Sequence, residues 1–332
     1  MKRFLKWLLI VIVLLVCLYY THSYYRSFRS PGASYTGKLK PLDTFQARVR
    51  DNMTEHVTML ASQIGERNLA HYDRLEQAAA YIRQQLEQQD YTVQEQDFTV
   101  NGKTCRNLFV VLDGSDKSKG AVVIGAHYDS VAGSPGANDN GSGVAAVLEL
   151  ARTLKRAATT RPIIFAFFPN EEPPYSQTSN MGSLQLARWF KLHRWQITLM
   201  ISIETIGYYS DRSGSQKYPT GIASFYPSTG NFIGFVSDLK SRALLHRTVA
   251  AFRDTTHFPS EAAALPGWMR GVAWSDHWSF WQTGVPAIMV TDTAPFRYPY
   301  YHTANDTPDK LDYDKMARVV VGLKHVVQTL AQ

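Results

Sequence analysis

The sequence is poor in cysteine, and its excess of positive charge is confined to one end. Only two of the 332 residues are cysteines, Cys17 and Cys105, so a disulfide framework and a cysteine-ligated zinc site are both excluded. The formal net charge is +7, but residues 1–50 hold nine basic residues and one acid, which leaves −1 for residues 51–332. Nucleic-acid binding needs a basic patch or stripe. We therefore expect no nucleic-acid partner.

The sequence also lacks internal repeats, low-complexity tracts and the signature of a serine hydrolase. The GSG at residues 141–143 does not have the G-x-S-x-G pattern of a nucleophile elbow. Ser275, Asp276 and His277 are contiguous, whereas a catalytic triad converges from separate elements. With 45% hydrophobic and 19% charged residues, the composition is that of an ordinary globular protein with one large core.

The N-terminus carries three basic residues and then a continuous apolar run from Trp7 to Tyr20. With Phe4 and Leu5 the run reaches the lower end of the roughly 17–25 residues that span a bilayer. It ends in bulky residues, not in the small residues of a cleavage site, so we expect an uncleaved anchor over residues 1–22, with a cleaved signal peptide as the alternative.

The basic residues before the apolar run place the N-terminus in the cytoplasm. We therefore expect a single-pass membrane protein that contacts membrane lipid through this helix. A polar linker over residues 23–42 would lead to one domain over residues 43–332. That domain would lie outside the cytoplasm, in a periplasm or at the cell exterior.

Beyond the linker, apolar runs alternate with helical patterns. The patterns predict helices at 43–64, 71–89, 143–156, 181–193 and 313–331, and strands at 91–100, 107–114, 121–127, 161–170, 197–207 and 285–292. This alternation predicts an α/β fold of three layers, in which helices cover both faces of a central mixed, mostly parallel sheet. Functional groups in such folds lie outside the carboxyl ends of the strands.

Acidic and histidine side chains follow three of the predicted strands and stand in two loops; they are His127, Asp129, Asp139, Glu171, Glu172, Glu204 and His302. Singly, each has an ordinary explanation as a solvated loop residue, a turn former or a helix cap. Together, the carboxylates would repel one another and raise one another's pKa unless a cation neutralised them. Mixed histidine and carboxylate ligands suit zinc. The adjacent pair Glu171–Glu172 would leave one acid free to act as general base beside a metal-activated water.

The sequence resembles the co-catalytic di-zinc exopeptidases over roughly residues 50–330. Four motifs carry the resemblance, in this order: HYDS…GANDNGSG, NEE, an acid before IGY, and YHT…DT. That family includes secreted bacterial aminopeptidases, glutamate carboxypeptidases and glutaminyl cyclases. The resemblance implies two Zn²⁺ ions as cofactors and peptides as substrates.

The resemblance also implies a role for each matching ligand. Asp139 bridges the two metals, His127 and Glu204 complete one site, and Glu172 and His302 complete the other. Many members have aspartate where Glu204 stands. Because glutamate is one methylene longer than aspartate, either its strand lies farther from the metal or the carboxylate binds the metal in another mode.

Further roles follow from the same resemblance. Glu171 is the general base, and Asp129 orients the metal-bound imidazole, which needs such a partner. Tyr301 polarises the scissile carbonyl, and Asp276, in the segment SDHWSF, orients or binds substrate. The family also predicts a cis peptide bond before Asn140.

These observations favour a zinc-dependent aminopeptidase, with three alternatives. A glutaminyl cyclase, an acyltransferase with one zinc, shares most of these residues. A carboxypeptidase needs a fixed cation for the terminal carboxylate, and neither Arg270 nor Arg297 lies in a matching motif. A non-catalytic binding domain has no physical need for all these ligand types together with Glu171. The preferred N-terminal residue and the oligomeric state stay open.

Overall fold

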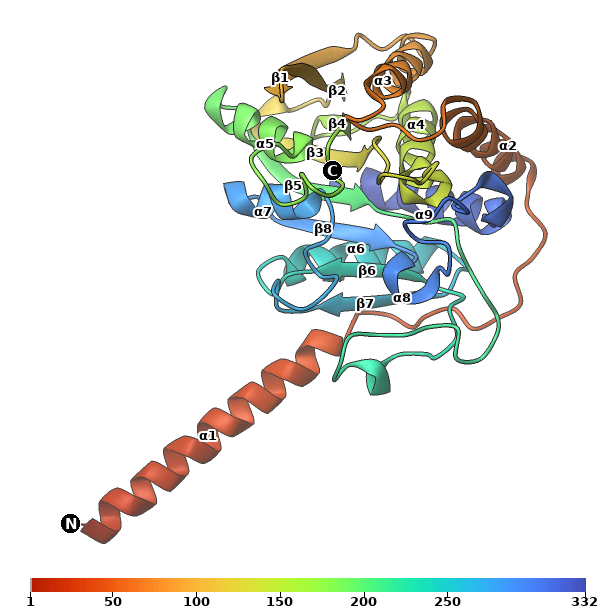
Figure 1. The fold of residues 1–332 in the computed structure, drawn as a ribbon. Helices are drawn as coiled ribbons and strands as arrows, with labels where there is room; N and C mark the ends of the chain where they lie inside the picture. The colour runs from red at the N-terminus through yellow and green to blue at the C-terminus, as the bar shows by residue number, and fades with distance from the viewer. Residues whose placement is uncertain (1) are drawn as a thin grey trace.

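An eight-stranded sheet forms the centre of the molecule (Figure 1). The computed structural model describes residues 2–332, except for the side chains of residues 2, 3 and 19–27. The strands are β1 (Gln94–Val100), β2 (Lys103–Leu112), β3 (Ala121–His127), β4 (Ile163–Phe168), β5 (Ile197–Ile203), β6 (Ile233–Ser237), β7 (Ser260–Ala264) and β8 (Ala287–Thr291). Their order across the sheet is β1-β2-β4-β3-β5-β8-β6-β7.

The sheet is mixed, and three of its four parallel pairs lie in the middle. β3 runs parallel to β4 and β5, and β5 runs parallel to β8. β6 and β7 form a further parallel pair, whereas β1–β2, β2–β4 and β6–β8 are antiparallel. The predicted α/β class with a mixed, mostly parallel sheet is confirmed. Because β4, β3, β5 and β8 share one direction, their carboxyl ends meet at a single edge of the sheet.

Helices cover both faces of the sheet. The larger core buries one face under α2 (Thr44–Thr58), α3 (Tyr72–Glu87), α4 (Gly143–Leu154), α6 (Arg242–Thr255) and α9 (Tyr313–Leu330). The smaller core on the other face packs under α5 (Gly182–Leu192) and α7 (His277–Thr283). A short helix, α8 (Ala294–Arg297), follows β8. Every residue of β3 and β4 is buried, which explains their continuous apolar sequences.

Two of the helices start at capped residues. Asp43 precedes α2 and accepts a hydrogen bond from the backbone nitrogen of Gln46, whose side chain accepts one from Asp43 in return. Asp312 precedes α9 and accepts from the backbone nitrogen of Lys315 at 3.0 Å. These caps satisfy N–H groups that have no partner inside the helix. The helix predicted over residues 43–64 divides, because a π-helical turn at Met59–Ile64 follows α2.

Four elements between residues 208 and 284 were not predicted: β6, α6, β7 and α7. Strand β7 reads Ser-Glu-Ala-Ala-Ala, which lacks the branched and aromatic residues typical of strands. Helix α6 carried a readable signal, because Leu245, Val249 and Phe252 recur at helical spacing and are buried. The segment between β5 and β6, residues 204–232, is a long covering loop over one end of the sheet.

Helix α1 (Lys2–Phe28) projects away from the rest of the chain (Figure 1). Within the part of the chain that the structure describes, no helix is long and apolar enough to cross a bilayer. The membrane anchor predicted over residues 1–22 is therefore unsupported by the structure. Part of it, residues 1–3 and 19–22, lies outside the residues whose side chains are described.

Candidate metal centre and active site

Three neighbouring strands bring their polar ends together. His127 is the last residue of β3, Glu171 and Glu172 follow β4, and Glu204 follows β5. Because β3 lies between β4 and β5 in the sheet, these side chains converge on one point. All four are at least nine-tenths buried. The sequence placed them at separate strand ends, and the parallel pairing makes them neighbours.

Asp139 reaches the same point from the loop between β3 and α4. The peptide bond between Asp139 and Asn140 is cis, as the family resemblance predicted. The side-chain carbonyl of Asn140 accepts from the backbone nitrogens of Gly143 and Thr205, at 3.0 and 3.1 Å. These bonds fix the loop between the start of α4 and the end of β5, so the direction of the Asp139 carboxylate is set by its surroundings.

The two oxygens of Asp139 face two different histidines. Oδ1 lies 3.4 Å from Nε2 of His127, and Oδ2 lies 3.1 Å from Nε2 of His302. Around His127, the second acid is Glu204, whose Oε2 lies 3.2 Å from Nε2. Around His302, the second acid is Glu172, also at 3.2 Å. The site is thus two clusters, each of one histidine and two carboxylates, that share Asp139.

Several buried polar atoms of the two clusters lack hydrogen-bond partners, as expected for atoms that bind a metal. Nε2 of His127, Oδ1 of Asp139, Oε1 of Glu172 and Nε2 of His302 are all buried and lack a hydrogen-bond partner. Buried polar atoms are rarely left this way, because the cost is about 1–3 kcal/mol for each. A divalent cation in each cluster would satisfy them. Three such ligands around an open position are the usual donor set of a catalytic zinc site.

The acids in the site have perturbed proton affinities. Burial and the charge of Asp139 raise the pKa of Glu172 to about 8. Burial alone would raise the pKa of Asp139, but its contacts with His127 and His302 lower it. Burial also raises the pKa of Glu171 well above its ordinary value. Packing these carboxylates without a cation is therefore costly, which is the condition that a bound metal removes.

Glu171 stands beside the clusters and belongs to neither. Its Oε2 lies 4.0 Å from Nε2 of His127, so it faces the same space from one side. Its neighbour Glu172 points into the second cluster. The adjacent pair therefore divides into one acid in a metal cluster and one acid beside it.

Asp129 lies behind His127 and has a second set of contacts. Its Oδ1 is 3.4 Å from Nδ1 of His127, on the ring edge away from the cluster. The two oxygens also accept hydrogen bonds from the backbone nitrogens of Glu171 and Glu172, at 3.1 and 3.2 Å. Asp129 therefore connects the end of β3 to the loop after β4.

The remaining predicted residues lie at the edge of the site. The Tyr301 ring stacks on the His302 ring, with centroids 3.8 Å apart. Asp276 is fully buried, its pKa is raised by burial to about 7, and its charge raises the pKa of Glu171. Both residues are thus close to Glu171 and the clusters.

The sequence did not reveal the residues that support the ligands. Ser275 donates to Oε2 of Glu204 at 2.7 Å, and Asn140 donates to the same oxygen at 3.4 Å. These contacts hold the longer side chain of Glu204 toward His127. Asp306 accepts from the backbone nitrogens of Asn138 and Asp139, at 2.8 and 3.1 Å. Asp306 was visible only as part of the motif YHT…DT.

A fully buried arginine is the second unforeseen feature. The Arg67 side chain donates to five backbone carbonyl oxygens, those of Leu60, Gly65, Tyr128, Pro135 and Gly136. The last three belong to the loop between His127 and Asp139. Burial lowers the pKa of Arg67 to about 10, while Asp129 and other acids of the site act to raise it. Arg67 therefore ties the metal-site loop to the turn that follows α2.

The model of peptidase family M28 matches residues 107–327, which contain every one of these site residues except Arg67. The chain belongs to peptidase family M28. It is a hydrolase of the metallo-exopeptidase class, which confirms the resemblance seen in the motifs. Zinc is the cofactor that the family and the donor set indicate.

Two sequence relatives give the extent of similarity. The protein YfbL of Escherichia coli strain K12 is 35% identical over 282 residues, 82% of this chain and 86% of that protein. A probable leucine aminopeptidase of Arthroderma otae is 30% identical over 234 residues, 65% of this chain and 55% of that protein. The chain thus spans about half the length of this probable leucine aminopeptidase.

Solved structures show the same fold at lower identity. The LapA aminopeptidase of Legionella pneumophila superposes with a TM-score of 0.65 at 21% identity, covering 89% of this chain and 77% of LapA. A glutaminyl cyclase of Fimbriiglobus ruber superposes with a TM-score of 0.63 at 19% identity, covering 90% and 99%. The fold is therefore shared by aminopeptidases and cyclases and does not separate these two activities.

Proposed function

We propose that the chain is a zinc-dependent aminopeptidase that hydrolyses the first peptide bond of peptides with a free N-terminus. The observation that carries this proposal is the pair of clusters that share Asp139, with the carboxylate of Glu171 beside them. Two ions are proposed, one held by His127, Asp139 and Glu204 and the other by Asp139, Glu172 and His302. Zinc at these positions would supply a Lewis acid that lowers the pKa of a water molecule to near neutral.

Glu171 carries the proton transfers in this proposal. Its carboxylate takes a proton from the attacking water and returns it to the nitrogen of the leaving amine. Support comes from its position beside His127 and from the two backbone hydrogen bonds that Asp129 accepts from the Glu171–Glu172 pair. Asp129 keeps the His127 imidazole oriented through Nδ1. Tyr301 is proposed to polarise the scissile carbonyl by donating a hydrogen bond to its oxygen, and Asp276 to orient or bind the substrate.

The charges of the site favour a free α-amine. Oxygens of Glu171 and Glu204 face the space where a substrate's positive N-terminus would lie. A carboxypeptidase would instead need a cation to bind a terminal carboxylate. Arg297 is already bonded to Gln216 and to the carbonyl of Phe232, at 2.7 Å each. Arg270 is exposed and lies over the rings of Trp274 and Phe296.

A product assay separates this function from its alternatives. Peptides that begin with Leu, Phe, Lys or Gln are offered with their N-acetylated twins, and products are followed by mass. Loss of one residue from the unblocked peptides alone supports an aminopeptidase. Loss of ammonia from the Gln peptide alone means a cyclase, and cleavage of acetylated peptides from the C-terminal end means a carboxypeptidase. No reaction with any peptide in the presence of zinc would favour a binding domain.

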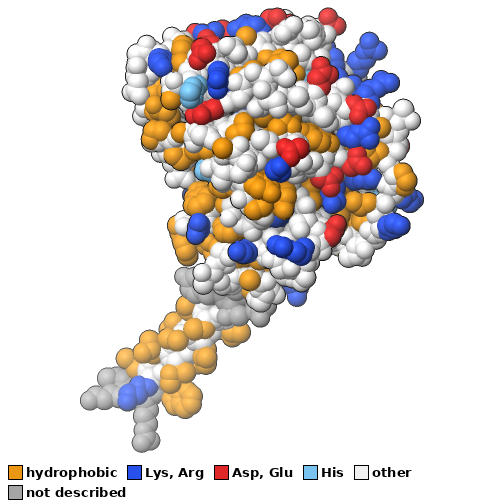
Figure 2. Space-filling model, turned by 45° about the vertical axis from the view of Figure 1, so that its right-hand side comes forward, with side chains coloured by type: hydrophobic (Ala, Val, Ile, Leu, Met, Phe, Trp, Pro, Cys, Tyr) orange, Lys and Arg blue, Asp and Glu red, His pale blue; other side chains and the backbone are white. Residues whose placement is uncertain are grey.

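The membrane anchor and the location of the catalytic domain outside the cytoplasm remain proposals. What supports them is the row of exposed apolar side chains from Phe4 to Leu18 on the projecting helix (Figure 2). Fractionation of the full-length chain tests them. The anchor predicts a membrane fraction that resists salt extraction, whereas a mature chain that begins after residue 20 would identify a cleaved signal.

A further inference from the structure

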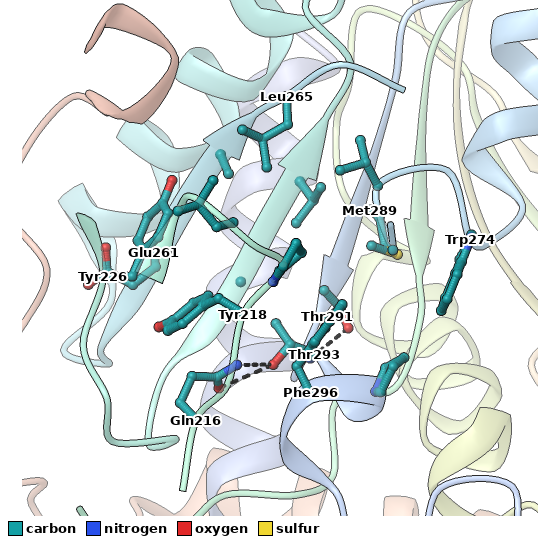
Figure 3. A pocket seen from close by; sticks show the side chains of 18 of the residues that line it. Gln216, Tyr218, Tyr226, Glu261, Leu265, Trp274, Met289, Thr291, Thr293 and Phe296 are labelled. Atoms are coloured by element: carbon teal, nitrogen blue, oxygen red, sulfur yellow. Dashed lines mark hydrogen bonds between the residues drawn. The ribbon is translucent and has the colours of Figure 1, made fainter. Parts of the chain in front are cut away.

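A pocket opens next to the metal clusters on the opposite half of the sheet from β1 and β2. Its lining includes Glu204, a proposed zinc ligand, and Tyr301, the neighbour of His302. The floor is formed by β6, β7 and β8, and the covering loop before β6 supplies Tyr218 and Tyr226 (Figure 3). The pocket is therefore continuous with the place where the reacting bond would lie.

The pairing of the strands fixes the length of this pocket. Ile203 pairs with Val290, so Glu204 comes level with Thr291, which pairs with Gly234. Gly234 in turn pairs with Glu261 on β7. Partners in register point to the same face of a sheet, and neighbouring strands are about 4.8 Å apart. Glu204 and Glu261 therefore stand at opposite ends of one row, roughly 14 Å apart across three strand spacings.

Small side chains leave the row open between its two ends. Gly234, in the middle of the row, lines the pocket without a side chain. Ala263 continues the small surface on β7. The walls are apolar and aromatic, and in Figure 3 Glu261 and Tyr226 lie at one end of the pocket and Trp274 at the other. The result is an apolar trough that ends in a carboxylate.

The carboxylate of Glu261 is only partly compensated by its surroundings. Burial raises its pKa, while the charge of Arg253 and a contact with Ser34 lower it. The donors of Arg253 are directed elsewhere, to Ser260 and to residues 30–32 of the linker. The two other charged residues of the lining, Lys217 and Arg270, are exposed at the rim. A cation that entered the trough would therefore meet Glu261 as its partner.

We propose that this trough binds the side chain of the substrate's N-terminal residue and that Glu261 selects a lysine or an arginine there. This inference rests on the proposed aminopeptidase function. Five single bonds of about 1.5 Å separate the Cα and Nζ of lysine, so the extended side chain spans roughly 6 Å. With one hydrogen bond of about 3 Å from the α-amine toward Glu204 and another from the ammonium to Glu261, an N-terminal lysine covers most of the roughly 14 Å row. The tyrosines and Gly234 accept its aliphatic stem, and its ammonium reaches Glu261. A leucine side chain is too short to reach this carboxylate.

Substrate competition on the full-length, zinc-loaded chain tests the assignment. Peptides that differ only in their first residue, Lys, Arg, Leu or Glu, are compared by kcat/KM. We expect Lys and Arg to be preferred, and Glu261→Gln to lower kcat/KM for the Lys peptide about 10-fold to 100-fold, the value of one charged hydrogen bond. The Leu peptide should change by less than about threefold. Glu87→Gln, an equal charge change on the exposed side of α3, is the matched control.

Several outcomes overturn the assignment without touching the aminopeptidase proposal. If Glu261→Gln leaves the ratio of kcat/KM for the Lys and Leu peptides unchanged, Glu261 does not determine specificity. If the wild type prefers the Glu peptide, Lys217 and Arg270 at the rim, and not Glu261, select the N-terminal side chain. If the Gln variant unfolds, calorimetric binding of free L-lysine and L-leucine to the wild-type chain decides instead: at least about tenfold tighter binding of lysine is expected, and equal binding refutes it. Failure to cleave any unblocked peptide would mean that the proposed function itself is wrong.

Discussion

The backbone nitrogen of Glu171 donates to Oδ1 of Asp129, at 3.1 Å, and this bond connects the loop after β4 to the end of β3. The same Asp129 oxygen lies 3.4 Å from Nδ1 of His127. One buried carboxylate thus positions both a proposed zinc ligand and the proposed general base. Asp129 contacts the His127 ring and the backbone nitrogens of Glu171 and Glu172. Its loss should therefore weaken both metal binding and catalysis.

Replacing Asp129 with asparagine should weaken zinc binding and turnover. The amide keeps the shape and one acceptor but loses the charge that holds the His127 imidazole, and such orienting partners are typically worth 10-fold to 100-fold. We expect a loss of zinc affinity in that range, measured by competition with a metal indicator. Asp254→Asn, the same change at an exposed position of α6, serves as the control. Wild-type zinc affinity in Asp129→Asn would show that Asp129 does not orient the ligand.

Replacing Arg67 with methionine should destabilise the whole chain. The aliphatic stem is kept, but five buried carbonyl oxygens lose their donor, and each unsatisfied group costs about 1–3 kcal/mol. We expect the free energy of unfolding in urea to fall by at least about 3 kcal/mol. The same change at the exposed Arg188 of α5 should cost no more than about 0.5 kcal/mol. Equal stabilities for the two variants would contradict the proposed role of Arg67.

His56 should make the fold sensitive to mild acid. It is buried against Tyr81, with Nδ1 2.7 Å from the hydroxyl, and burial lowers the pKa of His56 to about 4. The unfolded chain takes up the proton near pH 6.5, so this residue adds no penalty above pH 6.5 and destabilises progressively as pH falls toward 4.

The size of this effect follows from the two pKa values. Between pH 7.5 and pH 5 the folded state should lose roughly 2 kcal/mol through His56. Urea unfolding of the wild type and of His56→Asn at both pH values isolates the contribution of His56 to the free energy of unfolding. The other titrating groups, the metal ligands included, are the same in both proteins and cancel in the comparison. A stability difference between the two proteins that does not change with pH would show that His56 titrates normally.

The centre of the site could be predicted from the sequence because its residues follow recognisable strands. Continuous apolar runs marked β3, β4 and β5, and parallel strands bring their carboxyl ends to one edge. His127, Glu172 and Glu204 each follow such a run, so their convergence needed no knowledge of the loops. Asp139 and His302 lie in loops, and only the resemblance to a family assigned them to the same centre.

The supporting residues could not be read from the sequence in this way. Arg67 makes five hydrogen bonds to backbone carbonyls, and backbone acceptors leave no pattern in the side chains. Ser275 stands in SDHWSF, and no pattern in that segment indicates that its hydroxyl reaches Glu204. Glu261 stands on a strand too rich in alanine to be recognised from the sequence. Its place in the pocket depends on the order β8-β6-β7, which no local pattern encodes.

In the proposed catalytic centre, two zinc ions act together with the carboxylate of Glu171. Glu171→Gln tests it most directly, with zinc content and peptide turnover measured on the same sample. We expect the variant to hold two zinc ions per chain, as the wild type should, and to lose kcat by about 10²–10⁴-fold, the usual contribution of general acid–base catalysis. Near-normal turnover in the variant, or an active wild-type chain that holds no divalent metal, would contradict it.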